Sequence, residues 1–307
     1  MAIPTEFREE SQLIKQQRTT TGRQWFSKVV QAFQRDPRLW LAVVLLLFVL
    51  VAIFAPVISP YPPLVYHPDI ATQPPSFAHW LGTDALGRDQ LSRIFYGART
   101  SLSIAVITIL LGGACGTILG LMAAYLKGWV DQVITIIIDA ILSFPSLVLA
   151  LAIVTALGPS IINLAIALAF VRIPIYARIS RGQALQISAQ DYVTAAQVSG
   201  TQTWKILFRH ILPNIFSPLL VQATISISAA ILDESALSFI GLGTQPPTPE
   251  WGSMITDAQT YLRSDPWMMV GPALAIVIVL LSMNILGDAV RDLLDPRDRS
   301  QVIKPTE

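Results

Sequence analysis

Residues 188–214 read SAQDYVTAAQVSGTQTWKILFRHILPN, a polar stretch between two strongly apolar segments. Ser188 followed three residues later by Asp191 fits a capping box, in which a hydroxyl and a carboxylate satisfy free amide groups at a helix start. Gly200 is typical of a helix end, and Thr201 after it suits the N-cap of the next helix. The stretch therefore predicts two short helices that meet at Gly200, and we call residues 188–214 the elbow.

The composition around the elbow indicates a membrane protein. Of the 307 residues, 53% are apolar and only 13% are charged, whereas a soluble domain carries about 25% charge. The net charge of +1 argues against a nucleic-acid partner. Six apolar segments have the length or hydropathy of transmembrane helices. We predict these spans at residues 39–58, 102–126, 132–157 (bent softly at Pro145), 161–176, 214–232 and 267–286.

The distribution of lysine and arginine sets the orientation of the six spans. With the N-terminus inside, seventeen of the 21 basic residues fall in cytoplasmic segments and four fall outside. Both termini and the elbow are therefore predicted to be cytoplasmic. The fold class is an all-α integral membrane protein with six transmembrane helices.

The segment before the second span has features of its own. A Pro-rich outer segment precedes the second span, and its residues Leu91, Ile94, Phe95 and Ala98 share one helix face, which predicts an amphipathic helix in the membrane interface. Asp89 and Arg93 are spaced for an i,i+4 pair on the solvent-facing side of that helix.

The whole chain is predicted to divide into five parts. They are an N-terminal cytoplasmic tail (1–38), the first span (39–58), the outer segment (59–99), a core of five spans (100–287, with a coupling loop at 177–212) and a C-terminal tail (288–307).

Sites for cofactors are not evident in the sequence. The single cysteine, Cys115, allows no disulfide framework, and His67, His79 and His210 are too widely spread to indicate a metal site. A phosphate-binding loop of the GK[ST] type is also missing, because none of the lysines follows a glycine. If transport here uses ATP, another subunit must hydrolyse it.

Three separated motifs resemble permeases of ABC importers. The elbow is similar to the cytoplasmic EAA loop of that family, with Thr194-Ala195-Ala196, Gly200 and Leu212-Pro213 at the family spacing; Thr194 stands where the family has Glu. The segments Leu81–Arg99 and Arg291–Arg297 look like those of the dipeptide, oligopeptide and nickel branch, and specifically of the second of its two permeases. The resemblance covers residues 80–297 and implies the MetI-like permease fold.

The resemblance also implies partners and a location. It implies a heterodimer with a second permease, two ABC ATPase subunits that bind ATP and Mg²⁺, and an extracytoplasmic substrate-binding protein. The lipid bilayer would be that of a bacterial or archaeal plasma (inner) membrane, with this chain as a multi-pass subunit that binds no cofactor of its own. The cargo expected on this basis is a di- or oligopeptide, with nickel or another small solute as the alternative.

The candidate site residues follow from the same reasoning. Coupling to the ATPase subunit would involve Asp191, Thr194, Ala195, Ala196, Gly200, Leu212 and Pro213. Asp139 and Glu234 are candidates for the substrate passage, although a structural contact is favoured for Asp139 because the resemblance places an Asp there too. We expect Glu234 to face the bundle or passage and Asp233 to face solvent or lipid headgroups; the alternative is that both are solvated loop charges.

Two other classes of function stay open at this point. A secondary transporter or channel subunit that needs no ATPase would place charges along an ion path or show inverted repeats with broken helices. A membrane enzyme would need a nucleophile with its acid and base, or a metal cluster. Only Asp139 lies clearly inside a predicted span, no repeat is evident, and no such catalytic set is found in the sequence.

Overall fold

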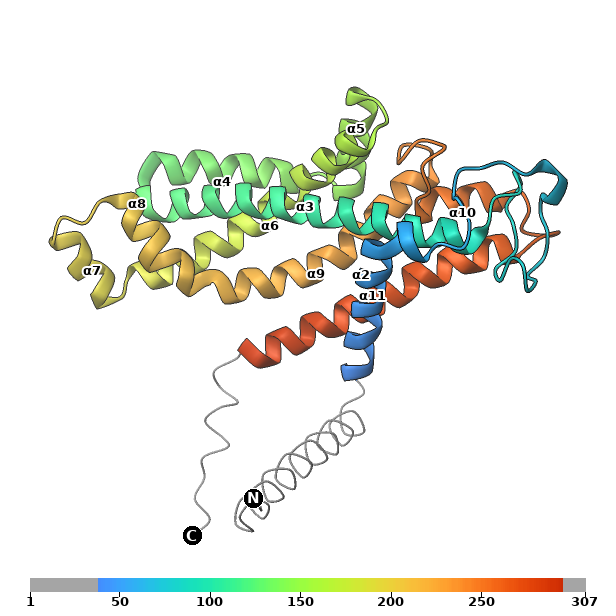
Figure 1. Cartoon of the computed structure of the whole chain (residues 1–307). Coiled ribbons are helices and arrows are strands. Elements are labelled where there is room, and N and C mark those ends of the chain that lie inside the picture. The colour runs from blue at the N-terminus through green and yellow to red at the C-terminus, as the bar shows by residue number, and fades with distance from the viewer. Residues whose placement is uncertain (1–37, 295–307) are drawn as a thin grey trace, which may run out of the picture.

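The computed structural model describes residues 38–294, and these form helices joined by loops (Figure 1). Within this range the one β-type pairing is an isolated bridge between Thr83 and Asp89. The predicted all-α class is confirmed; most of both predicted tails lies outside the described residues. The elements are α2 (Arg38–Ile58), the 3-10 turn η1 (Pro68–Ile70), α3 (Gln90–Leu126), α4 (Gly128–Leu142), α5 (Ser146–Leu157), α6 (Ile161–Ser188), α7 (Asp191–Val198), α8 (Thr203–Lys205), the π-helical turn η2 (Ile206–Ile211), α9 (Leu212–Phe239), α10 (Trp251–Gln259) and α11 (Trp267–Leu294).

Five of the described segments are long and apolar enough to cross a membrane, and a bent helix pair makes a sixth if it counts as one span. That pair is α4 and α5, which meet at 91°. The soft bend predicted at Pro145 is therefore wrong. Proline has no amide donor and disfavours helical geometry in the residue before it, Phe144, so the chain breaks there and starts a new helix at Ser146.

Several helices run beyond their predicted ends. α6 continues from the span through Ser188, α9 continues through Phe239, and α11 continues to Leu294. Arg178 and Arg181, which follow the predicted fourth span, therefore lie inside α6. The sequence after Tyr176 contains no proline before the elbow, so nothing in it stops the helix at the membrane surface.

The closest helix packing in the described chain joins α3 to α6. A side chain at Gly112 would lie 2.6 Å from the carbonyl oxygen of Ala169, and side chains at Gly116 and Gly120 would collide with the carbonyl oxygens of Ile173 and Ala177. The three glycines recur every four residues on one face of α3, which lets the two backbones touch. These three glycines are thus packing positions, and α3 and α6 form one close-packed pair.

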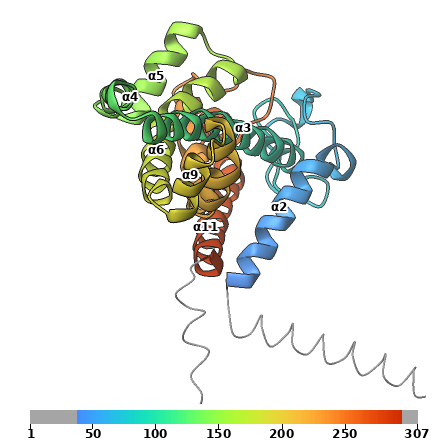
Figure 2. The same ribbon diagram turned by 90° about the vertical axis from the view of Figure 1, so that its left-hand side faces the viewer.

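Helix α2 lies across the bundle rather than along it, against α3 and α11 (Figures 1 and 2). Phe48 of α2 packs edge-on against the buried Trp251 of α10, with ring centroids 6.1 Å apart. The indole nitrogen of Trp251 donates to the carbonyl oxygen of Ile94 in α3 at 3.1 Å. These contacts join α2, α3 and α10 into the main apolar core.

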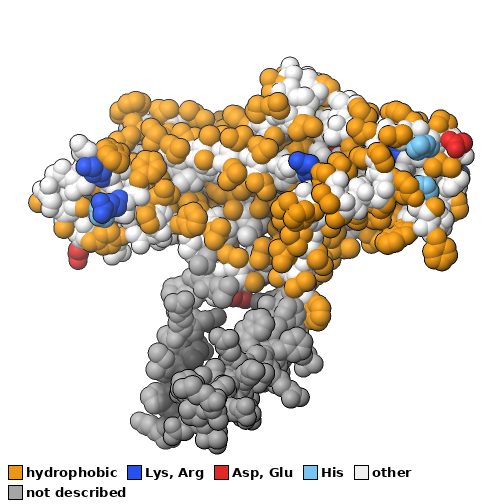
Figure 3. All heavy atoms as spheres, viewed as in Figure 1, with side chains coloured by type: hydrophobic (Ala, Val, Ile, Leu, Met, Phe, Trp, Pro, Cys, Tyr) orange, Lys and Arg blue, Asp and Glu red, His pale blue; other side chains and the backbone are white. Residues whose placement is uncertain are grey.

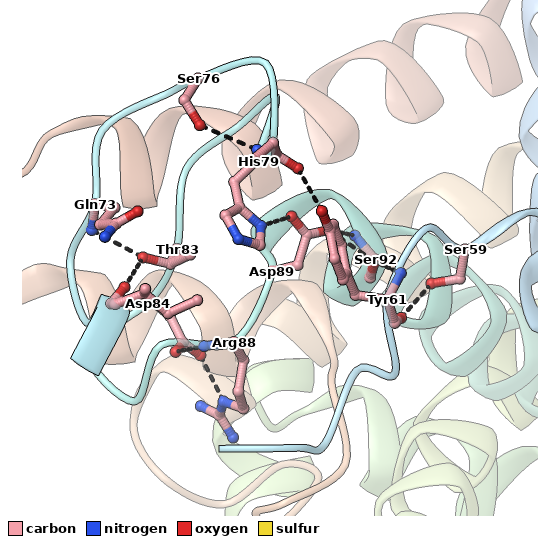
Figure 4. Close-up of polar contacts among 12 residues, drawn as sticks. Ser59, Tyr61, Gln73, Ser76, His79, Thr83, Asp84, Arg88, Asp89 and Ser92 are labelled. Atoms are coloured by element: carbon pink, nitrogen blue, oxygen red, sulfur yellow. Dashed lines mark hydrogen bonds and ion pairs between the residues drawn. The ribbon is translucent and has the colours of Figure 1, made fainter. Parts of the chain in front are cut away.

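The outer segment differs most from its prediction. Residues 90–99 are the first turns of α3, which continues without a break into the span, so a separate interfacial helix is not present. The predicted Asp89–Arg93 side-chain pair is also wrong. Asp89 instead caps α3, where its carboxylate accepts from the amide and hydroxyl of Ser92 at 2.8 and 2.7 Å and contacts Nδ1 of His79 at 2.8 Å (Figure 4).

A second buried carboxylate organises the loop before α3, residues 59–89, which we call the outer loop. Asp84 accepts from the amides of Leu86 and Arg88 at 2.9 Å each and from Nε of Arg88 at 2.6 Å. Nε of Arg93 lies 3.4 Å from the same carboxylate. Gly87 has φ +72°, and a side chain there would overlap the carbonyl of His67. Thr83, Asp84, Arg88 and Asp89 therefore belong to a compact polar cluster next to the start of α3 (Figure 4).

Candidate functional site

The elbow lies at the end of the bundle opposite the outer loop (Figure 1). It begins where α6 ends and consists of α7, a turn at residues 199–202, α8, the π-helical turn η2 and the start of α9. Val193 of α7 is fully buried and belongs to the same apolar cluster as Ile206 and Ile211 of η2. We call α7 the first arm of the elbow and α8 with η2 the second arm. Because these side chains fix α7 against η2, the two arms form one packed unit.

The turn at Gly200 has the geometry of a Schellman motif. The amide of Thr201 donates to the carbonyl oxygen of Ala196 at 3.1 Å, and the amide of Gly200 donates to that of Gln197 at 3.0 Å. Gly200 has φ +74°, a left-handed conformation that costs a residue with a side chain roughly 1–2 kcal/mol. The predicted helix end at Gly200 is confirmed, and the glycine is needed for its backbone.

The predicted caps of the elbow helices are wrong. Ser188 is the last residue of α6, and its hydroxyl has no partner among the described residues, whereas Gln190 occupies the N-cap of α7 without a side-chain bond. Gln202 rather than Thr201 precedes α8. Because α6 continues through Ser188, that residue cannot cap the next helix. Asp191 is instead the first residue of α7, where a carboxylate is favourable beside the free amides of a helix start.

Asn214 ties the two arms together from the start of α9. Its side-chain amide donates to the carbonyl oxygen of His210 at 2.6 Å and to the hydroxyl of Tyr192 at 3.2 Å. Pro213, next to it, has no amide to donate and crowds the carbonyl of Arg209, four residues earlier. We attribute the wide π-helical turn of η2 to this proline. The Leu212-Pro213 pair thus shapes the second arm, and sequence reasoning missed the Tyr192–Asn214 link.

The exposed side of the elbow, which we call its outward side, combines small residues with large apolar side chains. Asp191, Thr194 and Ala195 are exposed, and Ala196 is partly buried. The neighbouring surface exposes four large apolar side chains, which are Tyr192, Val198, Trp204 and Phe208. Small residues next to exposed aromatic ones offer a helix backbone that another protein can approach closely, with apolar anchors around it.

Helix α6 links the elbow to the spans through three ion pairs. Arg181 donates to the carboxylate of Asp131 in α4 at 2.5 and 2.7 Å, and Arg178 donates to Asp139 in α4 at 2.6 Å. Deeper in the bundle, Arg172 pairs with Asp233 of α9. These three arginines of α6 therefore connect it to α4 and α9, which the span boundaries in the sequence did not indicate.

The two candidate passage residues have different surroundings. Asp139 is about half exposed and held by Arg178, as expected for a structural contact. Glu234 is fully buried, accepts from Ser101 of α3 at 3.3 Å, and contacts the carboxyl of Glu250, which caps α10. Glu234 therefore faces the bundle, as predicted. Its neighbour Asp233 does not face solvent or headgroups, because α9 continues past it and brings it to Arg172. A passage role for Asp139 or Glu234 stays a prediction.

The sequence matches known families and relatives over most of its length. Residues 116–300 match the family described as binding-protein-dependent transport system inner membrane component, and residues 26–75 match the N-terminal TM domain of oligopeptide transport permease C. A dipeptide transport system permease protein, DppC of Alkalihalophilus pseudofirmus, is 42% identical over 88% of this chain and 90% of its own. The di/tripeptide permease DppC of Pseudomonas aeruginosa is 44% identical over 82% and 86%. The glutathione permease GsiD of Escherichia coli O6:K15:H31 is 44% identical over 83% and 85%.

Solved structures resemble the fold at lower sequence identity. The inward-facing MetNI methionine ABC transporter superimposes with a TM-score of 0.55 at 16% identity, covering 67% of this chain and 96% of the transporter chain. An amino acid ABC transporter superimposes with a TM-score of 0.52 at 18% identity, covering 66% and 95%. The part shared with these structures is two thirds of the chain and accounts for nearly all of each matched chain.

Proposed function

The chain belongs to the binding-protein-dependent transport permeases of ABC importers, in their dipeptide and oligopeptide branch, and on that premise we propose that it forms one half of a membrane passage for short peptides. The other half would be a second permease of the same fold. The observation that carries this proposal is the high identity to dipeptide and di/tripeptide permeases over most of both chains.

We assign coupling with ATP hydrolysis to the elbow. Its outward side combines the small residues Ala195 and Ala196 with exposed aromatic side chains, as a docking surface for an ATPase subunit requires. Its two arms are fixed to each other by the buried Val193 and by Asn214. A displacement of α7 therefore moves the start of α9 as well. ATP and Mg²⁺ would bind to the ATPase subunits.

The path from the elbow into the membrane begins with α6. The ion pairs of Arg178 and Arg181 connect α6 to α4, and the glycine face of α3 packs against α6 along its length. When the ATPase subunits close, α3 and α6 would move together as a rigid pair and tilt the passage from inward-open to outward-open. An extracytoplasmic binding protein would deliver the peptide at the outer end.

The cargo is tested by isolating the importer from its host with its soluble binding protein. The bound ligand is identified by mass spectrometry, and uptake of a labelled dipeptide is then measured in vesicles that hold both permeases and both ATPase subunits. We expect a peptide ligand and ATP-dependent uptake. A metal ion or a sugar on the binding protein, with no peptide uptake, would contradict the proposed substrate class and leave the coupling proposal standing.

A further inference from the structure

A lateral groove of about 480 Å³ runs between α2, α3 and α11 on the side of the bundle. Its walls are apolar and include Val49 and Ile53 of α2, Val106 and Ile107 of α3, and Met283 of α11. Most of these side chains are also exposed to the surroundings of the chain. The volume falls in the range of about 300–1,000 Å³ that is typical of ligand pockets. Figure 3 shows hydrophobic side chains over much of the visible face of the bundle.

One charged side chain lines this groove, the exposed guanidinium of Arg99. Two other arginines at the same end of α3, Arg88 and Arg93, are buried and share the carboxylate of Asp84. Arg99 takes part in none of the ion pairs formed within residues 38–294. The groove therefore ends at a guanidinium that the described chain does not neutralise.

The depth of Arg99 suits the headgroup region of the outer leaflet. Helix α3 has 37 residues, which is about 55 Å at 1.5 Å per residue, while the hydrocarbon core of a bilayer is only about 30 Å thick. Arg99 lies three residues before Leu102, where the continuous apolar part of α3 begins. The outer turns of α3 extend beyond the hydrocarbon, so Arg99 can place its guanidinium at the level of lipid phosphates.

We propose that this groove is a phospholipid-binding site of the outer leaflet, in which Arg99 holds the phosphate and the α2–α3–α11 walls hold an acyl chain. Guanidinium and phosphate match in geometry, because two parallel N–H groups can donate to two phosphate oxygens. A peptide cargo would need polar partners for its backbone, and the groove wall below Arg99 offers only Ser103 as a polar side chain. A bound lipid would fasten α2, which lies across the bundle, to α3.

The test uses the full importer purified in mild detergent and examined by native mass spectrometry with added phosphatidylglycerol. The variants are Arg99→Gln, which removes the phosphate contact, and Ser103→Phe, which fills the groove and keeps the arginine. Arg263→Gln is the matched control, because it removes an exposed basic residue that lies between α10 and α11 and does not line the groove. Diacylglycerol, which has the same tails without phosphate, is the ligand control.

We expect one tightly held phospholipid per chain in the wild type and in Arg263→Gln. Arg99→Gln should lower its affinity by about ten-fold or more, as loss of a charge-assisted hydrogen bond implies, and Ser103→Phe should lower it as well. Diacylglycerol should bind no better to the wild type than to Arg99→Gln. Equal retention in all variants would overturn the proposal. Dissociation of the second permease from Arg99→Gln, with unchanged lipid retention, would also overturn it by making the groove a subunit contact.

Discussion

The amide of Thr201 donates to the carbonyl oxygen of Ala196 across the turn of the elbow, at 3.1 Å. This bond places Gly200 in a left-handed conformation between the two arms, with open space where a side chain would project. Any effect of a substitution at Gly200 on the isolated chain must therefore come from backbone strain rather than from a collision. That separation makes the turn suitable for testing how the two arms are held.

Replacing Gly200 by Val should strain the turn by roughly 1–2 kcal/mol and change the angle between the arms. Gly200→Asn is the matched control, because asparagine adopts the left-handed conformation more readily. We expect peptide uptake in reconstituted vesicles to fall strongly for Val and weakly for Asn. Equal loss in both variants would mean that the site rejects any side chain, and the strain argument would be wrong.

The glycine face between α3 and α6 predicts a difference between two glycines that lie three residues apart. A methyl group at Gly116 would collide with the carbonyl oxygen of Ile173, whereas one at Gly113 would meet the Tyr176 ring at an ordinary 3.4 Å. Gly116→Ala should lower the stability of the complex by about 1–3 kcal/mol, and Gly113→Ala should change it little. Thermal unfolding of the purified importer measures both, and equal midpoints would contradict the packing.

The ion pair of Arg172 with Asp233 should show strong coupling in a double-mutant cycle. Both side chains are largely buried between α6 and α9, so Arg172→Ala or Asp233→Ala alone leaves a buried charge and should cost about 3–5 kcal/mol. The double variant should cost much less than the sum of the two. Additive losses in thermal unfolding would show that the two side chains act independently.

The orientation of the chain can be tested by labelling introduced cysteines in a Cys115→Ser background. Phe77 in the outer loop and Gln202 in the elbow are both exposed. A cysteine at Phe77 should react with an impermeant thiol reagent on intact cells, and one at Gln202 only after permeabilisation. The reverse pattern would place the elbow outside and remove the basis for coupling.

The sequence predicted the helical class and the elbow because both depend on local chemistry. Apolar length predicts spans, and Gly200 ends α7 because glycine accepts its backbone conformation. The residues whose surroundings were predicted wrongly are those whose position depends on how far a helix extends. Ser188 has the right spacing for a cap but is the last residue of α6. Asp233 was expected to face solvent or headgroups because the continuation of α9 past it depends on packing around Glu234 and Arg172.

The outer loop shows a second limit of prediction from sequence, because the partners of its charged residues depend on how the loop folds. Asp89 and Arg93 have the spacing of a surface ion pair, but the loop folds back over the start of α3 and buries both. Asp89 then pairs with His79 and Arg93 with Asp84, ten and nine residues away in the sequence. Such partners depend on the path of a loop rich in proline and glycine, which helical periodicity does not describe.

The central claim is that the elbow transmits ATPase motion to the spans and does not choose the cargo. Ala196→Lys adds a long charged side chain to the small-residue surface of α7, and Ala196→Ser is the size-matched control. The decisive measurement is the ATPase rate of the reconstituted importer with and without loaded binding protein, together with uptake. We predict that Ala196→Lys assembles with the second permease but loses stimulation and uptake, while Ala196→Ser keeps both. Normal stimulation and uptake in Ala196→Lys would contradict the claim and leave residues 188–214 as a surface loop.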